Sequence, residues 1–150
     1  MNAKGKLTVA AAGLLIVAAA AYWFLFYPKI LLKNTFHEMV SAFENEEVNT
    51  LIDYFSSDYR DESNMLRADV EDFLVFFFEQ RENIRCDVAQ TKMLVHGKKA
   101  TVQVWGEIHF QTRDGEKTIS LRDTPLVLIF ARERNGWRMV DVGNGATMLE

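Results

Sequence analysis

The feature that most constrains this chain is a run of 21 residues without a charge, from Leu7 to Tyr27. As an α-helix, with about 1.5 Å of rise per residue, the run is about 31 Å long, which matches the hydrocarbon core of a bilayer. Three aromatic residues gather at its C-terminal end, where amphipathic rings meet lipid head groups: Tyr22, Trp23 and Tyr27. The run predicts one transmembrane helix over residues 7–27, behind a short tail of residues 1–6.

A cleavable signal peptide is the alternative interpretation of the same run. Lys4 and Lys6 provide a basic beginning, and the alanines at 18–21 provide a small-residue cleavage site. Cleavage there would leave a new N-terminus that reads YWFLFYPKILL, which is strongly apolar. We therefore expect an uncleaved anchor.

The charges that flank the run predict its orientation. Lys4, Lys6 and the terminal amine precede it, and Lys29 and Lys33 follow it. Because positive charges are retained in the cytoplasm, the N-terminus is expected there and the folded domain in the periplasm or outside the cell. Cys86 is the sole cysteine, which excludes a disulfide framework and a zinc site built from cysteines.

The residues after the run predict a linker over residues 28–34, one domain over residues 35–143 and a tail over residues 144–150. A capping box at Thr35–Glu38 predicts the start of a helix. A second, short helix follows with Val48, Leu51, Ile52 and Phe55 on one face. A third is expected to begin near Ser63 or Asn64, and its many apolar residues predict burial on more than one side.

The second half of the domain has the pattern of antiparallel strands. Strands are predicted over residues 84–95, 100–111, 118–132 and 137–142, and Pro125 interrupts the third. Asp114-Gly115 and Asn135-Gly136 are hairpin turns. The whole pattern predicts an α+β fold: an N-terminal transmembrane helix, then three helices packed on a curved antiparallel sheet of about four strands.

Charge is divided unevenly within a formal net charge of −4. Residues 34–82 carry 13 acidic and 3 basic side chains, whereas residues 83–150 carry 8 acidic and 10 basic ones. Solvated helix faces and basic protection of sheet edges explain this division; an acidic surface that selects a basic partner is the alternative. The acidic balance argues against nucleic acid as a partner.

Two segments resemble the nuclear transport factor 2-like superfamily. Phe43–Asp58 is similar to the family's helix, short break and second helix, and Asn135–Val142 is similar to its final strand after a tight turn. The resemblance implies a cone in which a curved sheet wraps the helices. It leaves the function open, because this fold hosts enzymes, binding proteins and scaffolds.

The resemblance also tests one activity. The family's ketosteroid isomerases use a tyrosine on the first helix and an aspartate base after the second; here these positions fall on Met39 and near Ser63, with Glu62 one residue away. Methionine donates no hydrogen bond and serine is no base at neutral pH, so isomerase chemistry is not expected. No spacing in the sequence predicts a cofactor or a metal site; the loop acids Asp58, Asp61 and Glu62 lack calcium-loop spacing.

The outward face of the predicted sheet carries the favoured functional hypothesis. An interface is predicted there, anchored by a tryptophan in a polar surround: Trp105, Gln103, Glu107, His109, Val127 and Ile129. The chain is then a membrane-anchored, non-enzymatic binding or assembly module of the bacterial cell envelope, with a second copy or another envelope protein as partner. Cover by a helix or by residues 143–150 is the alternative for this face.

A small-molecule-binding or enzymatic cone is the alternative function. Its pocket would be apolar, with Glu107, His109, Asp141 and Phe77 in it. Glu107 and His109 share one face of a strand, a spacing that could ligate a metal or exchange a proton, although a polar strand face explains the pair as well. Cys86 alternates with Ile84 and Val88 and is expected to be an inert core thiol.

Overall fold

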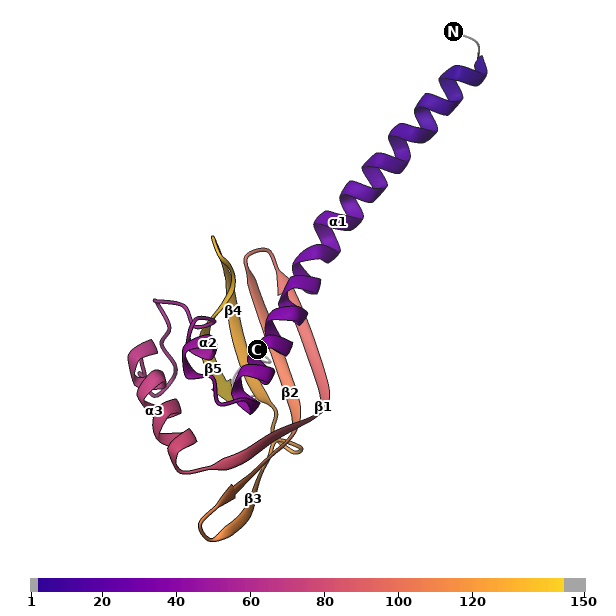
Figure 1. Cartoon of the computed structure of the whole chain (residues 1–150). Coiled ribbons are helices and arrows are strands. Elements are labelled where there is room, and N and C mark those ends of the chain that lie inside the picture. The colour runs from indigo at the N-terminus through magenta and orange to yellow at the C-terminus, as the bar shows by residue number, and fades with distance from the viewer. Residues whose placement is uncertain (1–2, 145–150) are drawn as a thin grey trace.

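The N-terminal helix is a single rod that runs from outside the domain into its core (Figure 1). The computed structural model describes the backbone of residues 3–144 and the side chains of residues 11–143. Helix α1 spans Ala3–Glu44 without interruption and contains Pro28. The segment expected as a linker, residues 28–34, is therefore helical. The expected helix start at Thr35 is wrong, because the helix-forming residues before it leave nothing to end the preceding turn.

Two short helices complete the helical layer. Helix α2 spans Val48–Ile52, and helix α3 spans Arg67–Glu79. Helix α3 begins later than predicted because Asp61 holds the preceding loop: its Oδ1 accepts hydrogen bonds from the backbone N–H of Ser63 at 2.9 Å and of Met65 at 3.0 Å. At the first turn of α3 the Asp69 carboxylate accepts a hydrogen bond from the backbone N–H of Leu66.

The sheet has five antiparallel strands rather than about four. They are β1 (Glu82–His96), β2 (Lys99–Thr112), β3 (Gly115–Ser120), β4 (Leu126–Glu133) and β5 (Gly136–Asn144). The spatial order is β1-β2-β4-β5, and β3 also pairs with β2. The predicted third strand is divided at residues 121–125, next to Pro125. Both pieces pair with β2, β3 beside Glu107–Thr112 and β4 beside Lys99–Val104.

Gly106 lies where β1 and β2 approach most closely. The register of β1 shifts between Val88 and Gln90, which inserts one extra residue opposite β2. A Cβ atom at position 106 would lie 2.2 Å from the Asp87 carbonyl oxygen. This close approach requires glycine, and it bends the two long strands around the helices.

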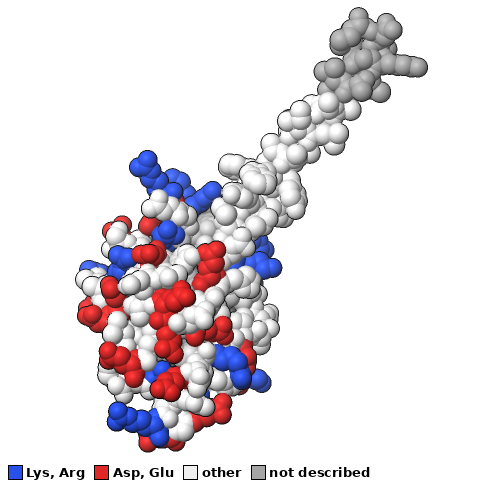
Figure 2. All heavy atoms as spheres, viewed as in Figure 1, with Lys and Arg blue, Asp and Glu red and all other residues white. Residues whose placement is uncertain are grey.

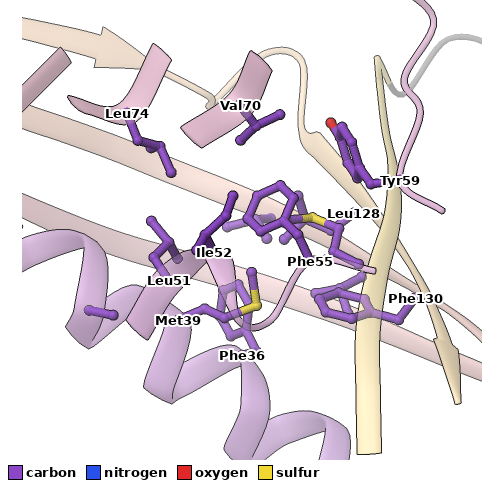
Figure 3. Packing of buried hydrophobic residues seen from close by; sticks show 14 of the residues in the cluster. Phe36, Met39, Leu51, Ile52, Phe55, Tyr59, Val70, Leu74, Leu128 and Phe130 are labelled. Carbon is purple, nitrogen blue, oxygen red and sulfur yellow. The ribbon is translucent and has the colours of Figure 1, made fainter. Parts of the chain in front are cut away.

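The core lies between the helices and the inner face of the sheet. Figure 3 shows side chains from α1, α2, the loop after α2, α3 and the strands pointing toward one another. Trp137, Phe130, Leu32 and Val102 are fully buried. The expectation that α3 is buried on more than one side is wrong. Its core face is formed by Val70, Leu74, Phe77 and Phe78, whereas its outer face leaves Phe73, Val75 and Phe76 exposed.

Candidate functional site

An apolar cavity of about 340 Å³ lies inside the cone. Its walls come from α1, α2, α3, the loop between α2 and α3, and the inner face of the sheet. The apolar walls include Phe36, Met39, Val40, Phe43, Leu51, Phe55, Val70, Leu74, Val104, Leu128 and Met139. The helical period of α1 explains its share of the wall, because Phe36, Met39, Val40 and Phe43 follow one another at steps of three, one and three residues on one face.

Two polar side chains reach this wall from the loop that follows α2. Tyr59 is 3% exposed, and its hydroxyl donates a hydrogen bond of 3.3 Å to Oδ2 of Asp61. The loop is fixed against β5: the N–H of Ser56 donates to the Met139 carbonyl at 2.8 Å, and the N–H of Arg60 donates to the Val140 carbonyl at 3.1 Å. The sheet therefore positions the tyrosine and the aspartate together.

The surroundings of Tyr59 keep it protonated. Burial raises the pKa of its hydroxyl well above the ordinary value, and the negative charge of Asp61 raises it further. Asp61 in turn is oriented by the two hydrogen bonds that its Oδ1 accepts from backbone N–H groups. The pair places a hydroxyl and a carboxylate, hydrogen-bonded to each other, on a mostly apolar wall, and a few polar groups on such a wall are typical of small-molecule sites.

Asp141 lies near this loop without joining the cavity wall. Burial raises the pKa of its carboxyl, and the negative charges of Glu62 and Asp61 raise it further, while the N–H of Val142 opposes the shift. Its Oδ1 is buried and accepts no hydrogen bond within the described part of the chain. Asp141 is thus a partly buried carboxyl of β5 whose charged form is disfavoured.

The other residues predicted for a pocket are dispersed. Glu107 is on the cavity wall. His109 is on the opposite side of β2 from the core, where its Nδ1 lies 2.9 Å from Oγ1 of Thr118 on β3. Phe77 is buried in the core, 5.7 Å from the Phe110 ring and beneath the guanidinium of Arg81. The structure therefore brings one of the four, Glu107, to the cavity.

The polar residues of the sheet form an ion-pair cluster. Nε2 of His109 lies 3.1 Å from Asp87 and 3.5 Å from Glu107, whose other oxygen is 2.9 Å from Nε of Arg122. Asp87 also pairs with Arg85 at 3.4 Å. The remaining residues of the predicted interface are Trp105, Gln103 and Ile129, each half-buried, and Val127, which is fully buried. Positive and negative side chains within the cluster pair with one another, and the cluster offers no open metal site.

Cys86 has the properties that the sequence predicts for a core thiol. It lies on the cavity wall, and burial raises the pKa of the thiol to about 11, with further contributions from Glu44 and Asp87. Its backbone N–H donates to Oε1 of Glu44 at 2.7 Å. A protonated thiol is a poor nucleophile and a poor metal ligand. Within the part of the chain that the structure describes, no three or more His, Cys, Asp or Glu side chains are arranged so that they could hold a metal ion.

The sequence predicts an apolar pocket only as the alternative function, and it does not predict the Tyr59–Asp61 pair. In the sequence Asp61 is one of several loop acids, and no pattern gives Tyr59 a role. The available signal is the pattern Asp61-x-Ser63, in which an aspartate accepts the N–H two residues later and holds a turn. That Tyr59 faces inward depends on the loop's pairing with β5, which local sequence does not encode.

This arrangement, a curved antiparallel sheet wrapped around helices with a cavity at its centre, defines the class of α+β cones. The chain belongs to the SnoaL-like domain family, whose model matches residues 32–143. The family match and the similar structures confirm the nuclear transport factor 2-like fold that the sequence predicted. A comparison of the sequence with curated proteins finds no match.

Several solved structures share this fold at low sequence identity. A candidate aromatic ring hydroxylase from Novosphingobium aromaticivorans is 12% identical with a TM-score of 0.69, over 79% of this chain and 88% of that one. A candidate dehydratase of the NTF2-like family from Streptomyces avermitilis is 12% identical with a TM-score of 0.66, over 79% and 95%. An NTF2-like superfamily protein from Salmonella enterica serovar Typhimurium is 11% identical with a TM-score of 0.68, over 79% and 90%. At these identities the likeness shows the fold.

Proposed function

We propose that this chain binds a small, largely apolar molecule in the cavity of its cone and is held at a membrane by the N-terminal part of α1. The observation that carries the proposal is the cavity itself: about 340 Å³, partly open to solvent and lined mostly by apolar side chains of three helices and the sheet. Its volume is within the range of ligand sites in proteins, about 300–1,000 Å³. Tyr59 and Asp61, which are hydrogen-bonded to each other, are polar groups that a ligand in the cavity would meet.

The similar structures agree with a ligand-binding role. Two of them are described as a candidate dehydratase and a candidate aromatic ring hydroxylase, which are activities on small molecules. We propose binding rather than catalysis for this chain, because Cys86 is a protonated thiol and Tyr59 donates to Asp61 rather than to an open position.

The membrane part of the proposal rests on exposed apolar surface. From residue 11 to residue 28, α1 carries no Lys, Arg, Asp or Glu (Figure 2). Its large side chains point to solvent, with Leu14 74% and Phe24 82% exposed. One helix within the described residues is long and apolar enough to span a bilayer, near the N-terminus. Lipid is the solvent that suits such a surface.

The ligand-binding proposal is tested with the full chain in phosphatidylcholine nanodiscs and the neutral fluorophore N-phenyl-1-naphthylamine. Val70 and Val75 lie on the same helix, the first on the cavity wall and 8% exposed, the second 42% exposed. Val70→Phe fills the cavity and is expected to abolish the saturable part of the fluorescence, whereas Val75→Phe keeps it. Equal binding by both variants would overturn the proposal.

A second variant protects this test against a failure to fold. Val104→Ile adds one methylene group to the cavity wall from β2, and such a change in a site with empty space costs little stability. It is expected to weaken binding of the fluorophore while the melting temperature stays within a few degrees of the parent. A cooperative melt of each variant shows that its binding can be compared.

The membrane proposal has its own experiment. Extraction of bacterial membranes with alkaline carbonate, followed by mass measurement of the chain, distinguishes an anchor from a cleaved leader. We expect the chain to stay with the membrane at its full mass. A chain that lacks residues 1–20 or so and is released into the soluble fraction would identify a signal peptide and overturn the anchor.

Association through the outer sheet face is a second candidate role, favoured by one observation. The three helices pack on the other face of the sheet (Figure 1), and Trp105 remains half-buried on β2 amid polar neighbours. We propose that a second copy or an envelope protein covers it. Trp105→Ala is expected to reduce cross-linking between copies, and unchanged cross-linking would count against this role.

A further inference from the structure

A second hollow, a groove of about 460 Å³, lies between α1 and β1. One wall is a row of basic and potentially basic side chains four residues apart on α1: Lys29, Lys33 and His37. At this spacing all three project from one side of the helix. The remaining walls are mostly apolar and come from both elements: Phe36, Val40, Val88, Thr91 and Met93. The groove therefore combines a cationic row with an apolar floor.

The groove and the cavity of the cone share a boundary. Phe36, Val40 and Val88 line both hollows, so these three side chains have the groove on one side and the cavity on the other. Phe36 is buried, Val40 is half-buried and Val88 is 41% exposed. The partition is thin, one layer of side chains, and its most exposed member lies on the strand next to the bulge of β1.

The position of the groove along α1 places it at the end of the apolar segment. Lys29 follows Tyr27 by two residues, and Lys33 lies about 9 Å beyond Tyr27 at the helical rise. Because α1 continues without a break, no flexible linker separates the groove from the segment proposed to cross the membrane. In a bilayer the two lysines would lie at the level of the lipid head groups.

The end of the domain beside the groove is basic as well. At this end the indole of Trp137 on β5 donates a hydrogen bond to the Pro28 carbonyl. Arg132 is the cross-strand partner of Trp137 in the β4–β5 hairpin, and its backbone N–H donates to the Lys98 carbonyl at 2.7 Å. Lys98 and Arg132 are exposed. Figure 2 shows basic side chains at this end, beside the base of the protruding helix. Such a surface complements anionic lipid.

We propose that the groove is the entrance of the cavity, and that the ligand is an anionic amphiphile with one apolar chain that is taken from the bilayer. Lys29 and Lys33 bind the anionic head group, and the chain passes between Val40 and Val88 into the cone. This inference rests on the proposed ligand binding and names the class of the ligand. Charge complementarity selects the head group, and the apolar cavity selects the chain.

The first experiment separates this inference from the proposed function by comparing two fluorophores in phosphatidylcholine nanodiscs. One is the neutral N-phenyl-1-naphthylamine, and the other is the fatty-acid analogue 11-(dansylamino)undecanoic acid. Lys29→Gln with Lys33→Gln is expected to weaken binding of the anionic probe about tenfold or more and to leave the neutral probe unchanged. Arg113→Gln with Lys117→Gln, which removes the same charge at the far β2–β3 hairpin, is the matched control.

The outcomes of this comparison are distinct. Weaker binding of the anionic probe in the Lys29/Lys33 variant, but not in the Arg113/Lys117 control, supports the groove as the entrance of the cavity. Equal affinity of the parent and this variant for the anionic probe overturns the entrance while the proposed function stands. Failure of the parent to bind the neutral probe overturns the proposed function itself, and the further inference with it.

The second experiment follows the chain of the amphiphile. A palmitic-acid analogue with a diazirine at its terminal carbon is supplied in the bilayer of the nanodisc and photoactivated. We expect labelled peptides from the cavity wall, such as the β4 peptide with Leu128, and we expect Val88→Trp to suppress that label by blocking the passage. Val75→Trp, at an equally exposed position on α3, is the control. Label confined to residues 11–27 would overturn the passage.

Discussion

The indole Nε1 of Trp137 donates a hydrogen bond of 2.9 Å to the backbone carbonyl of Pro28, across 109 residues of sequence. Trp137 is 1% exposed and belongs to β5, whereas Pro28 belongs to α1 at the point where that helix leaves the domain. The bond fastens the last strand of the sheet to the base of the protruding helix, and the large ring fills the space between them.

Trp137→Phe tests this fastening. The substitution keeps an aromatic ring in the core but removes the donor, and a net hydrogen bond contributes about 1 kcal/mol, with more lost where a buried partner is left unsatisfied. We expect the free energy of unfolding of the domain to fall by about 1–3 kcal/mol in urea titrations. Trp105→Phe, at a half-buried position on the sheet, is the control and is expected to cost less. Equal effects of the two would contradict the role of the bond.

Gly106→Ala tests the close approach of β1 and β2. The added methyl group would meet the Asp87 carbonyl oxygen at 2.2 Å, so the backbone of one strand has to shift. Overpacking of this kind costs about 1–3 kcal/mol, and we expect a lower melting temperature by several degrees. The change Gly13→Ala, which meets nothing within 4 Å, is expected to leave the melting temperature unchanged or slightly raised.

Asp141→Asn is expected to stabilise the domain at neutral pH. The unfolded chain titrates this carboxyl near its ordinary pKa of 3.8, and the folded chain titrates it at higher pH because burial disfavours the charge. Between the two values the folded state holds more protons, so stability falls as the pH rises through the folded pKa. The gain from asparagine should be full at pH 7 and should disappear below about pH 4 in thermal melts. Asp114→Asn, in the β2–β3 turn, serves for comparison; a gain from Asp141→Asn that does not depend on pH would contradict the assignment.

Cys86 is expected to resist alkylation in the folded chain. Its pKa of about 11, against an ordinary value of 9.0, lowers the thiolate fraction about a hundredfold at neutral pH, and the thiolate is the species that reacts. Iodoacetamide at pH 8 should therefore label the native chain at least about a hundredfold more slowly than the chain unfolded in urea. Comparable rates in the two states would show that the thiol is open to solvent and not perturbed.

Local patterns predicted those elements whose signals are themselves local. The hairpins at Asp114-Gly115 and Asn135-Gly136 are present, because a turn of this kind depends on a few residues that tolerate the required backbone angles. The predicted third strand is also interrupted next to Pro125, because proline has no N–H group to donate to a neighbouring strand. The family resemblance then supplied the arrangement of helices and sheet.

The features that the sequence did not predict depend on contacts between distant residues. The sequence predicts a helix over residues 7–27 followed by a linker, yet α1 continues through Pro28, whose carbonyl accepts a hydrogen bond from Trp137 near the other end of the chain. Tyr59 and Asp61 face the cavity because their loop pairs with β5, about 80 residues later. The apolar pocket was predicted as an alternative, but most of its lining was not, because that lining comes from helices, a loop and strands that are far apart in the sequence.

Because α1 is unbroken, the protruding segment and part of the cavity wall belong to one continuous helix. Its 42 residues form a rod of about 63 Å, and Phe36, Met39 and Phe43 on the inner third of that rod are walls of the cavity. Because α1 is continuous, a rotation or tilt of its outer two thirds would move these three side chains, so the orientation of the N-terminal half and the shape of the cavity are linked through one helix.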